Sequence, residues 1–145
     1  MLGRFPLKPA SYAIKAEVSN SETRIFVLPR QKTMYGGKTI SVGDSAFIFA
    51  SENDGGEGLL AYGVVTSAVA LPLDPRLERQ TPRISVTIRR TATAKRRLGR
   101  KELKPHAAWN DGRPETELNF KFYRQATNKV VGISAETAAY LHSFF

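Results

Sequence analysis

Apolar and polar positions alternate with the two-residue period of β-strands over much of this chain. The longest such stretch, residues 84–93, alternates large and polar side chains, which predicts a long strand with one face buried. Shorter runs at residues 12–18 and 24–28 predict two earlier strands. Pro29 is expected to close the second of these, because proline cannot donate to a strand ladder, and residues 31–39 are expected to form a loop.

Two further strands are predicted on either side of a glycine-rich loop. The apolar run 46–50 follows the turn dipeptide Gly43-Asp44, and the run 59–69 follows the polar loop 51–58. Two β-rich runs joined by a loop of this composition are typical of an antiparallel pair with a flexible connection.

The C-terminal part of the chain mixes loop, strand and helix signals. Residues 104–114 are expected to form a loop, and the short apolar run 120–123 predicts a last strand. Ser134 is a good N-cap and Glu136 is favourable in a first helical turn, so a C-terminal helix is expected to begin there. The total of about six strands and one or two short helices indicates an α+β fold around a curled mixed sheet.

Length and composition place the chain among ordinary globular proteins. Its 145 residues predict one domain, residues 1–145. The absence of cysteine excludes disulfides, thiolate catalysis and cysteine zinc sites, and fits the cytoplasm expected for this protein. No apolar run approaches the roughly 18 residues of a membrane span, so no membrane partner is predicted. Residues 1–10 lack the apolar centre of a secretory signal.

Positive charge is concentrated in one stretch of the sequence. The net charge is +9, and residues 89–104, called the basic segment below, hold eight basic side chains and one acidic one. The segment therefore carries +7, which leaves +2 for the remaining 129 residues. Such a concentration is typical of proteins that bind a polyanion, with nucleic acid as the first expectation. A solvated surface loop and an anionic membrane surface are the alternatives.

Several short motifs resemble catalytic or metal sites without matching them. The Gly-Gly-Lys-Thr at 36–39 has Lys32 where a P-loop needs glycine, and a turn follows it instead of a helix. The carboxylates of residues 52–57 do not have EF-hand spacing. His106 and His142 lie 36 positions apart, and nothing in their spacing supports a triad. We therefore predict no catalytic residue, no metal site and no cofactor.

Three segments together resemble the EVE-type domains of the PUA-like superfamily. Residues 13–18 are similar to the opening Trp-Leu-x-Lys-Ser-Glu-Pro pattern of that family and keep Lys15 and Glu17. Residues 42–65, with their Gly-Asp turn and Ala-x-Gly-x-Val strand, and residues 128–134 are similar to its sheet core and to its closing strand and helix start. The family's Trp-x-Gly-Val-Arg-Asn segment has no counterpart here. The resemblance implies a PUA-like pseudo-barrel.

The same resemblance implies a module that binds RNA or DNA and reads a modified or flipped base. The side chains expected to contact phosphates are Arg89, Arg90, Lys95, Arg96, Arg97, Arg100 and Lys101. The expected base or ligand pocket consists of Tyr12, Lys15, Glu17, Phe49, Ser51 and Trp109. Aromatic rings there would stack on a base, and polar groups would read its edge.

Two other functional classes fit the sequence. An enzyme acting on a nucleotide or nucleic acid would use Glu17 and Lys15 as acid–base groups. A small-metabolite or protein-interaction module would carry the basic segment without using it. The oligomeric state is not predicted.

Overall fold

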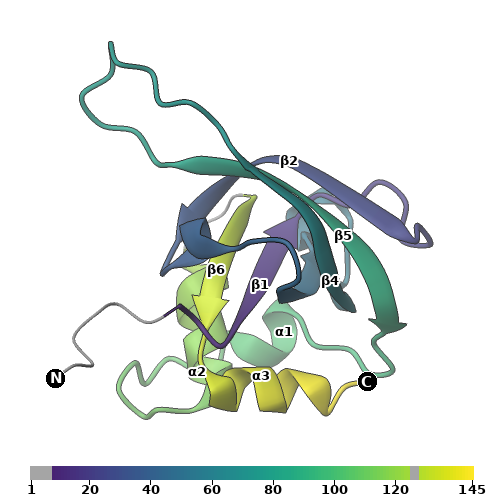
Figure 1. Cartoon of the computed structure of the whole chain (residues 1–145). Helices are drawn as coiled ribbons and strands as arrows, with labels where there is room; N and C mark the ends of the chain where they lie inside the picture. Colours follow the sequence, from purple (N-terminus) through teal and green to yellow (C-terminus); the bar gives the residue numbers. More distant parts are fainter. Residues whose placement is uncertain (1–7, 125–127) are drawn as a thin grey trace, which may run out of the picture.

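Six strands close into a barrel in the computed structural model, which describes residues 8–124 and 128–145 (Figure 1). Most of the N-terminal stretch in which no secretory signal was expected therefore lies outside the described residues. The order around the barrel is β1–β3–β4–β5–β2–β6. The strands are β1 (Ser11–Ala16), β2 (Ile25–Met34), β3 (Ser45–Ala50), β4 (Gly58–Ala70), β5 (Arg83–Thr93) and β6 (Lys129–Ile133).

The pairing around the barrel is mixed. Strand β1 runs parallel to β3 and antiparallel to β6, while β2 runs antiparallel to β5 and parallel to β6. Strands β3, β4 and β5 form an antiparallel series, in which the predicted pair around the glycine-rich loop is confirmed. The α+β class and the curled mixed sheet predicted from the sequence are therefore confirmed.

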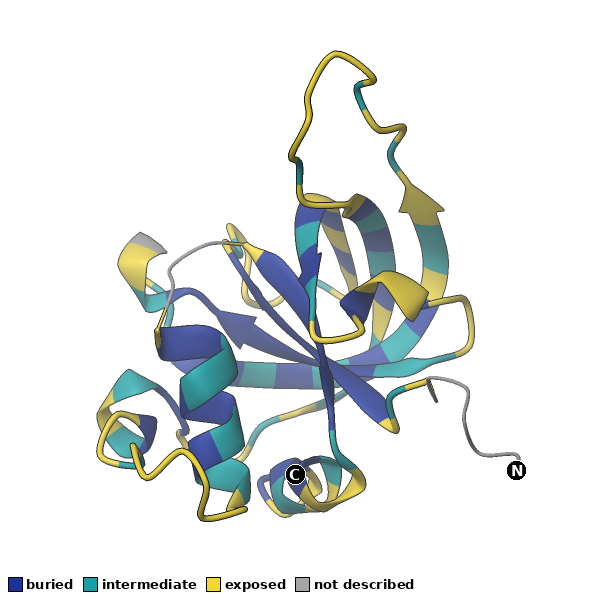
Figure 2. Cartoon of the chain, turned by 90° about the vertical axis from the view of Figure 1, so that its left-hand side faces the viewer, coloured by how far each residue is buried: buried dark blue, intermediate teal, exposed yellow. Residues whose placement is uncertain are grey.

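Two apolar clusters hold this barrel together, one inside it and one between its outer wall and the helices. Strand β1 is buried at every position because its two faces contribute to the two clusters (Figure 2). The inner cluster includes Ile14, Ile48 and Ile88, and the outer one includes Phe47 and Phe49. Each such side chain contributes roughly 1.5–3 kcal/mol by leaving water.

The helices cover the outer cluster. They are α1 (Arg100–Leu103), α2 (Pro114–Leu118) and α3 (Ala135–His142), and short 3-10 turns occur at Gly37–Thr39 and Glu52–Asp54. As predicted, Ser134 caps α3 by accepting a hydrogen bond from the Thr137 amide at 3.2 Å. None of the helices among the described residues is long and apolar enough to cross a membrane.

The predicted strand at residues 120–123 is wrong. The chain there continues α2 as a π-helical turn, Asn119–Tyr123. Pro114 in the first turn of α2 and two acidic residues beside it favour a helix start, and the helix then carries on through the apolar run. Leu118 and Phe122, four residues apart, both enter the outer cluster from this turn. A four-residue apolar run does not distinguish the two structures.

The expected end of the second strand at Pro29 is also wrong. Strand β2 shifts register between Leu28 and Gln31 and then continues to Met34 through residues expected to form a loop. The proline is accommodated because it lies in this irregularity, where a ladder hydrogen bond is not required. Arg30 beside it has φ 57°, in the left-handed region. The bulge therefore allows β2 to reach β6 and close the barrel.

Candidate functional site

The basic segment is packed against the start of β4. The amide of Leu59 donates to the Leu98 carbonyl at 2.8 Å, and the amide of Ala94 donates to the Leu60 carbonyl at 2.9 Å. Gly58 makes this approach possible: it has φ +86°, and a β-carbon there would overlap the Leu98 carbonyl group. Leu98 itself is buried in the outer cluster. The basic segment is therefore an integral part of the barrel wall.

Two arginines of the basic segment hold other parts of the chain in place. Arg90 donates to the Thr23 carbonyl at 3.0 Å, to the Thr93 hydroxyl at 2.8 Å and to the Ser21 carbonyl, with its guanidinium over Phe26.

Arg96 holds the chain just after α3 in place. It donates to the Ser143 carbonyl at 2.7 Å, and its guanidinium lies 4.1 Å from the centre of the Phe144 ring. Much of the hydrogen-bonding capacity of Arg90 and Arg96 is thus used inside the protein.

Two more arginines face the glycine-rich loop. Arg97 lies 3.3 Å from a Glu57 carboxylate oxygen and 3.8 Å from one of Glu52. The amide of Arg100 donates to Glu52 at 2.9 Å, and its guanidinium donates to Asn53 at 3.2 Å. Carboxylates of this loop are therefore neutralised by arginine. No group of three histidine, cysteine, aspartate or glutamate side chains suited to a metal occurs among the described residues.

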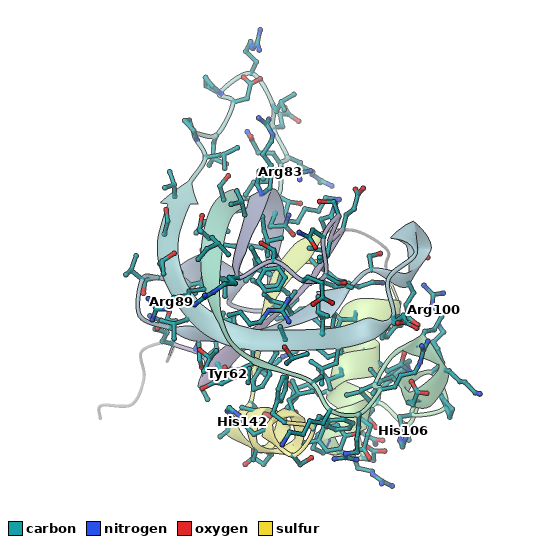
Figure 3. All side chains as sticks on the ribbon, turned by 90° about the vertical axis from the view of Figure 1, so that its right-hand side faces the viewer. Tyr62, Arg83, Arg89, Arg100, His106 and His142 are labelled. Carbon is teal, nitrogen blue, oxygen red and sulfur yellow. The ribbon has the colours of Figure 1, made fainter. Side chains whose placement is uncertain are left out.

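The remaining three predicted phosphate ligands are exposed. Arg89, Lys95 and Lys101 form no side-chain hydrogen bond or ion pair with any residue that the structure describes. Figure 3 shows Arg89 and Arg100 well apart, toward the left and the right of that view. These three cations are available to an external anion.

A groove of about 550 Å³ borders the basic segment. Its walls come from residues 93–97, from the glycine-rich loop and the start of β4, and from the turn after β1. Lys95, Arg96 and Arg97 line one wall, while Glu22 and Glu57 line others. The groove is polar, and its positive wall is the end of the basic segment.

The predicted base pocket is divided between the two sides of β1. Tyr12 points into the barrel, where its hydroxyl lies 2.7 Å from that of Thr39. Lys15 and Phe49 are cross-strand partners, and Phe49 packs in the outer cluster. The Lys15 ammonium lies 4.5 Å from the centre of the Tyr123 ring. The relative exposure of Tyr12, Lys15 and Phe49 is 1% or less, so this structure presents none of the three to solvent.

The other two strand-end residues lie closer to the surface. Ser51 is buried, but it directly precedes the turn that presents Glu52, and its amide donates to the Ala16 carbonyl at 2.8 Å. Glu17 is exposed, and its amide donates to the side chain of Asn128 at 2.9 Å. Their neighbour Lys15 is buried, so these polar groups do not converge on one accessible point.

Buried ionisable groups surround this part of β1. Burial, with Glu52 as hydrogen-bond acceptor at 2.8 Å, raises the pKa of the Tyr123 hydroxyl far above its usual value. Burial, together with the charges of Lys15 and Lys32, lowers the pKa of Lys129 to about 8. The two shifts have the same main cause, because removal from water disfavours the charged form of either group.

Trp109 lines a separate cavity of about 240 Å³ with Phe120, Arg113 and residues of α2. Its ring is 48% exposed and meets Phe120 edge to face, with centroids 5.4 Å apart. The guanidinium of Arg124 lies over both rings. Phe120 is not among the predicted pocket residues, because a strand at 120–123 would give no reason for it to contact the tryptophan.

The two histidines do not form a catalytic set in this structure. The His142 ring packs edge to face against Phe47 and Tyr62, with centroids 4.8 and 4.9 Å away (Figure 3). His106 lies in the loop after α1, and its carbonyl accepts a hydrogen bond from Asn119 at 2.9 Å. The His142 ring is therefore a packing group, and the His106 backbone helps to hold Asn119.

Comparison with known proteins gives matches at the level of structure. No family model matches this chain, and no curated protein has a similar sequence. The DUF55 domain of human thymocyte nuclear protein 1 has a TM-score of 0.60 at 15% identity, over 92% of this chain and 96% of that one. The fold is that of PUA-like domains of the EVE type. The fold implied by the sequence resemblance is therefore confirmed.

Two further solved structures share this fold. Human THYN1 protein in complex with DNA containing 5-methylcytosine has a TM-score of 0.60 at 16% identity, over 92% of this chain and 95% of that one. A protein from Pseudomonas putida has a TM-score of 0.57 at 18% identity, over 93% of this chain and 99% of that one. At these identities the shared property is the fold.

Proposed function

We propose that this protein binds nucleic acid through the basic segment and the groove beside it. The observation that carries the proposal is the set of three exposed cations without internal partners among the described residues: Arg89 on β5, Lys95 just after it and Lys101 in α1. Cations without internal partners can replace the counterions of a phosphate backbone, which is the main source of affinity in such complexes. The DNA complex of human THYN1, which shares the fold, supports the same kind of partner.

The seven basic residues predicted to bind phosphates divide into three roles in this proposal. Arg89, Lys95 and Lys101 contact phosphates directly. Arg90 and Arg96 mainly hold the surface in shape, and Arg97 and Arg100 form its boundary with the acidic loop. Phosphate contacts fix the position of a nucleic acid without reading its sequence.

Base recognition, including that of a modified base, is proposed at the Trp109 cavity. Of the predicted pocket residues, Trp109 has an exposed ring, and Phe120 and Arg124 extend its surface. A cavity of about 240 Å³ suits one planar ring, and stacking on an aromatic side chain contributes about 1–3 kcal/mol per base. Tyr12, Lys15, Phe49 and Ser51 are buried, and Glu17, although exposed, does not line this cavity.

The first experiment tests the phosphate contacts. Binding of duplex and single-stranded DNA and RNA is measured at several salt concentrations for the wild type and for Lys95→Gln/Lys101→Gln. Each lost phosphate contact reduces the slope of log affinity against log salt by roughly 0.7–0.9, so the double variant should lose about 1.5.

The control for this experiment is Lys8→Gln/Lys38→Gln, which removes the same charge from exposed lysines outside the basic segment. Its slope should stay close to that of the wild type. Equal slopes for all three proteins, or no binding by the wild type, would refute the proposed function.

The second experiment tests base recognition. Affinities for matched duplexes with and without 5-methylcytosine, and for single strands, are compared between the wild type, Trp109→Ala and Trp109→Phe. Loss of one stacked base should weaken binding by about 1–3 kcal/mol in the alanine variant, while phenylalanine should restore part of it. An alanine variant that binds every oligonucleotide like the wild type would remove Trp109 from the site and leave the phosphate contacts unaffected.

A further inference from the structure

The connection between β4 and β5, residues 71–82, projects from the barrel as an arm (Figures 1 and 2). It has a defined internal structure. The side-chain amide of Gln80 donates to the Asp74 carbonyl at 2.6 Å, and its oxygen accepts from the Asp74 amide at 2.9 Å. The root is fastened to β2, because the Pro82 carbonyl accepts hydrogen bonds from the amide and the hydroxyl of Thr33. These contacts hold the arm in a fixed direction.

A second cationic region lies at the root of this arm. A cavity of about 480 Å³ opens there between β2, the arm and β5. The chain brings four basic side chains to its lining from three separate segments, and we call them the arm-root cluster: Arg30, Lys32, Arg79 and Arg83. One carboxylate, Asp74, also lines the cavity, and it is engaged by Arg76 through two hydrogen bonds of 3.0 Å.

The charges of the arm-root cluster are available. Within the described residues, the side chains of Arg30, Lys32 and Arg79 form no hydrogen bond or ion pair, and Arg83 donates only to the Arg30 carbonyl, at 2.9 Å. Arg30 reaches this position through the bulge in β2, where its φ of 57° is unusual for a side chain of its size. Backbone strain of this kind is frequent at functional sites.

Strand β5 links the arm-root cluster to the basic segment. Its inward residues, among them Ile84 and Ile88, fill the barrel, so Arg83 at its start and Arg89 near its middle both point outward. Figure 3 shows Arg83 at the base of the arm and Arg89 farther along the same strand. Six residues of strand span about 20 Å, which corresponds to roughly six base pairs of a duplex.

We propose that the arm-root cluster is a second phosphate-contact site, which holds the sugar–phosphate backbone of the nucleic acid bound at the basic segment. The inference rests on the proposed function and adds a second region to it. A nucleic-acid backbone alternates charged phosphates with less polar sugars. The four cations of the cavity would contact the phosphates, and its apolar walls would contact the sugars. Leu73 and Leu77, on those walls, are 59% and 55% exposed. The bound nucleic acid then runs along the outer face of β5 from Arg89 to the arm.

Length dependence tests this proposal. Salt titrations are made with a short duplex, a hairpin stem of about 4 base pairs, and with a long one of about 20; the short stem is shorter than the spacing above, so it covers only one contact region. For Arg79→Gln/Arg83→Gln the slope on the long duplex should fall by about 1.5, with at least a tenfold loss of affinity at low salt. The slope on the short duplex should change less. The Lys8→Gln/Lys38→Gln protein is the control for net charge.

The single variant Arg79→Gln accompanies the double one, because Arg83 also bonds to β2 and its loss could disturb the barrel. The salt slope of Arg79→Gln on the long duplex should fall by about half as much as that of the double variant. Slopes on the long duplex equal to the wild type in both variants would overturn the second contact while leaving the basic segment as a binding site. A wild type that binds neither duplex would refute the proposed function and this inference together.

Inorganic tripolyphosphate serves as a second probe. Displacement of a labelled long duplex by tripolyphosphate should be weaker in the arm-root variants than in the wild type. If tripolyphosphate binds the wild type and not the variants, while duplex binding is unchanged, the cluster is a site for a small free anion and the assignment to nucleic acid is overturned.

Discussion

The basic segment and the arm-root cluster are both cationic, and they are built in different ways. The first is continuous in sequence, and four of its arginines are bonded to the rest of the protein: Arg90, Arg96, Arg97 and Arg100. The second collects residues from β2, the arm and β5, and most of its side chains have no internal partner among the described residues. The density of charge along the chain is therefore a poor measure of the charge that a ligand can reach.

The cause of the difference is packing. The basic segment forms part of the barrel wall and contacts the turn after β1, the glycine-rich loop and the C-terminal end of α3. Its arginines therefore lie next to carbonyl groups and carboxylates, which accept their hydrogen bonds. The arm projects into solvent, where Arg76 is paired with Asp74 but the side chain of Arg79 has no partner among the described residues. A nucleic acid would gain affinity from the few free cations of the first region and from most of the second.

The largest loss of stability is expected from Gly58→Ala, which disturbs the contact between the basic segment and β4 and leaves the arm unchanged. A methyl group at φ +86° would press on the Leu98 carbonyl group, so we expect a loss of roughly 3–4 kcal/mol in the free energy of unfolding. Denaturant unfolding measures it.

Gly55→Ala is the matched control for this substitution. Gly55 has a similar φ of +86° and no heavy atom within 4 Å of an added β-carbon, so about 1 kcal/mol is expected there. Equal losses in the two variants would show that Leu98 does not constrain the segment.

Replacement of one arginine in each region separates structural cations from free ones. Arg90→Ala removes three hydrogen bonds and the contact with Phe26, and should lower the free energy of unfolding by about 2 kcal/mol. Arg79→Ala in the arm should change it by less than about 0.5 kcal/mol. Thermal and denaturant unfolding of both variants tests the difference. If Arg79→Ala lowered the free energy of unfolding as much as Arg90→Ala, Arg79 would also be a structural cation and the distinction between the two regions would be wrong.

The pH dependence of stability tests whether Lys32, a member of the arm-root cluster, affects the ionisation of the buried Lys129. The lowered pKa of Lys129 means that between about pH 8 and 10.5 the unfolded chain binds more protons than the folded one. Stability should therefore rise with pH, by about 1.5 kcal/mol from pH 8 to pH 9.5. The raised pKa of Tyr123 acts in the opposite direction above pH 10, so the measurement stays below that value.

Lys129→Met should flatten this dependence, and Lys32→Met should reduce it in part, because Lys32 is one of the charges that lower the pKa of Lys129. Lys38→Met, at an exposed lysine, should leave it unchanged. An unaltered rise in Lys129→Met would assign the pH dependence to another group.

The smallest change in stability is expected from Glu57→Gln, which removes the nearer of the two carboxylates that pair with Arg97. Glu57 is exposed and its ion pair with Arg97 lies at the surface, so unfolding should change by less than about 0.5 kcal/mol. Nucleic-acid binding should tighten, with a salt slope steeper by up to about 0.9. Glu136→Gln alters the net charge equally on α3 and should produce a smaller change; identical effects would indicate a response to net charge alone.

Much of the barrel could be predicted because its strands carry local signals. The alternation in β5 and the glycine-rich loop between β3 and β4 identified these elements, and Ser134 identified the start of α3. The helical turn at 119–123 could not be identified, since its apolar residues serve a tertiary contact that a short run does not reveal.

The candidate site was less accessible to prediction. The arm-root cluster joins residues distant in sequence, and the bulge at Arg30 depends on the closure of the barrel. The cavity of Trp109 and Phe120 is local in sequence, but it depends on the helical turn that the short apolar run did not reveal. Charge counting located the basic segment but could not tell which of its arginines were occupied by internal partners.

The position of β6 in the barrel determines the order in which the molecule can be assembled. This strand lies between β1 and β2, so residues 129–133 close a ring whose other members all precede residue 94. During synthesis the apolar edge of β1 and the end of β2 must wait for the last part of the chain to emerge. A polypeptide stopped before residue 129 would present two open strand edges, which are sites of aggregation. The barrel can therefore close only once residues 129–133 are available to pair with both β1 and β2.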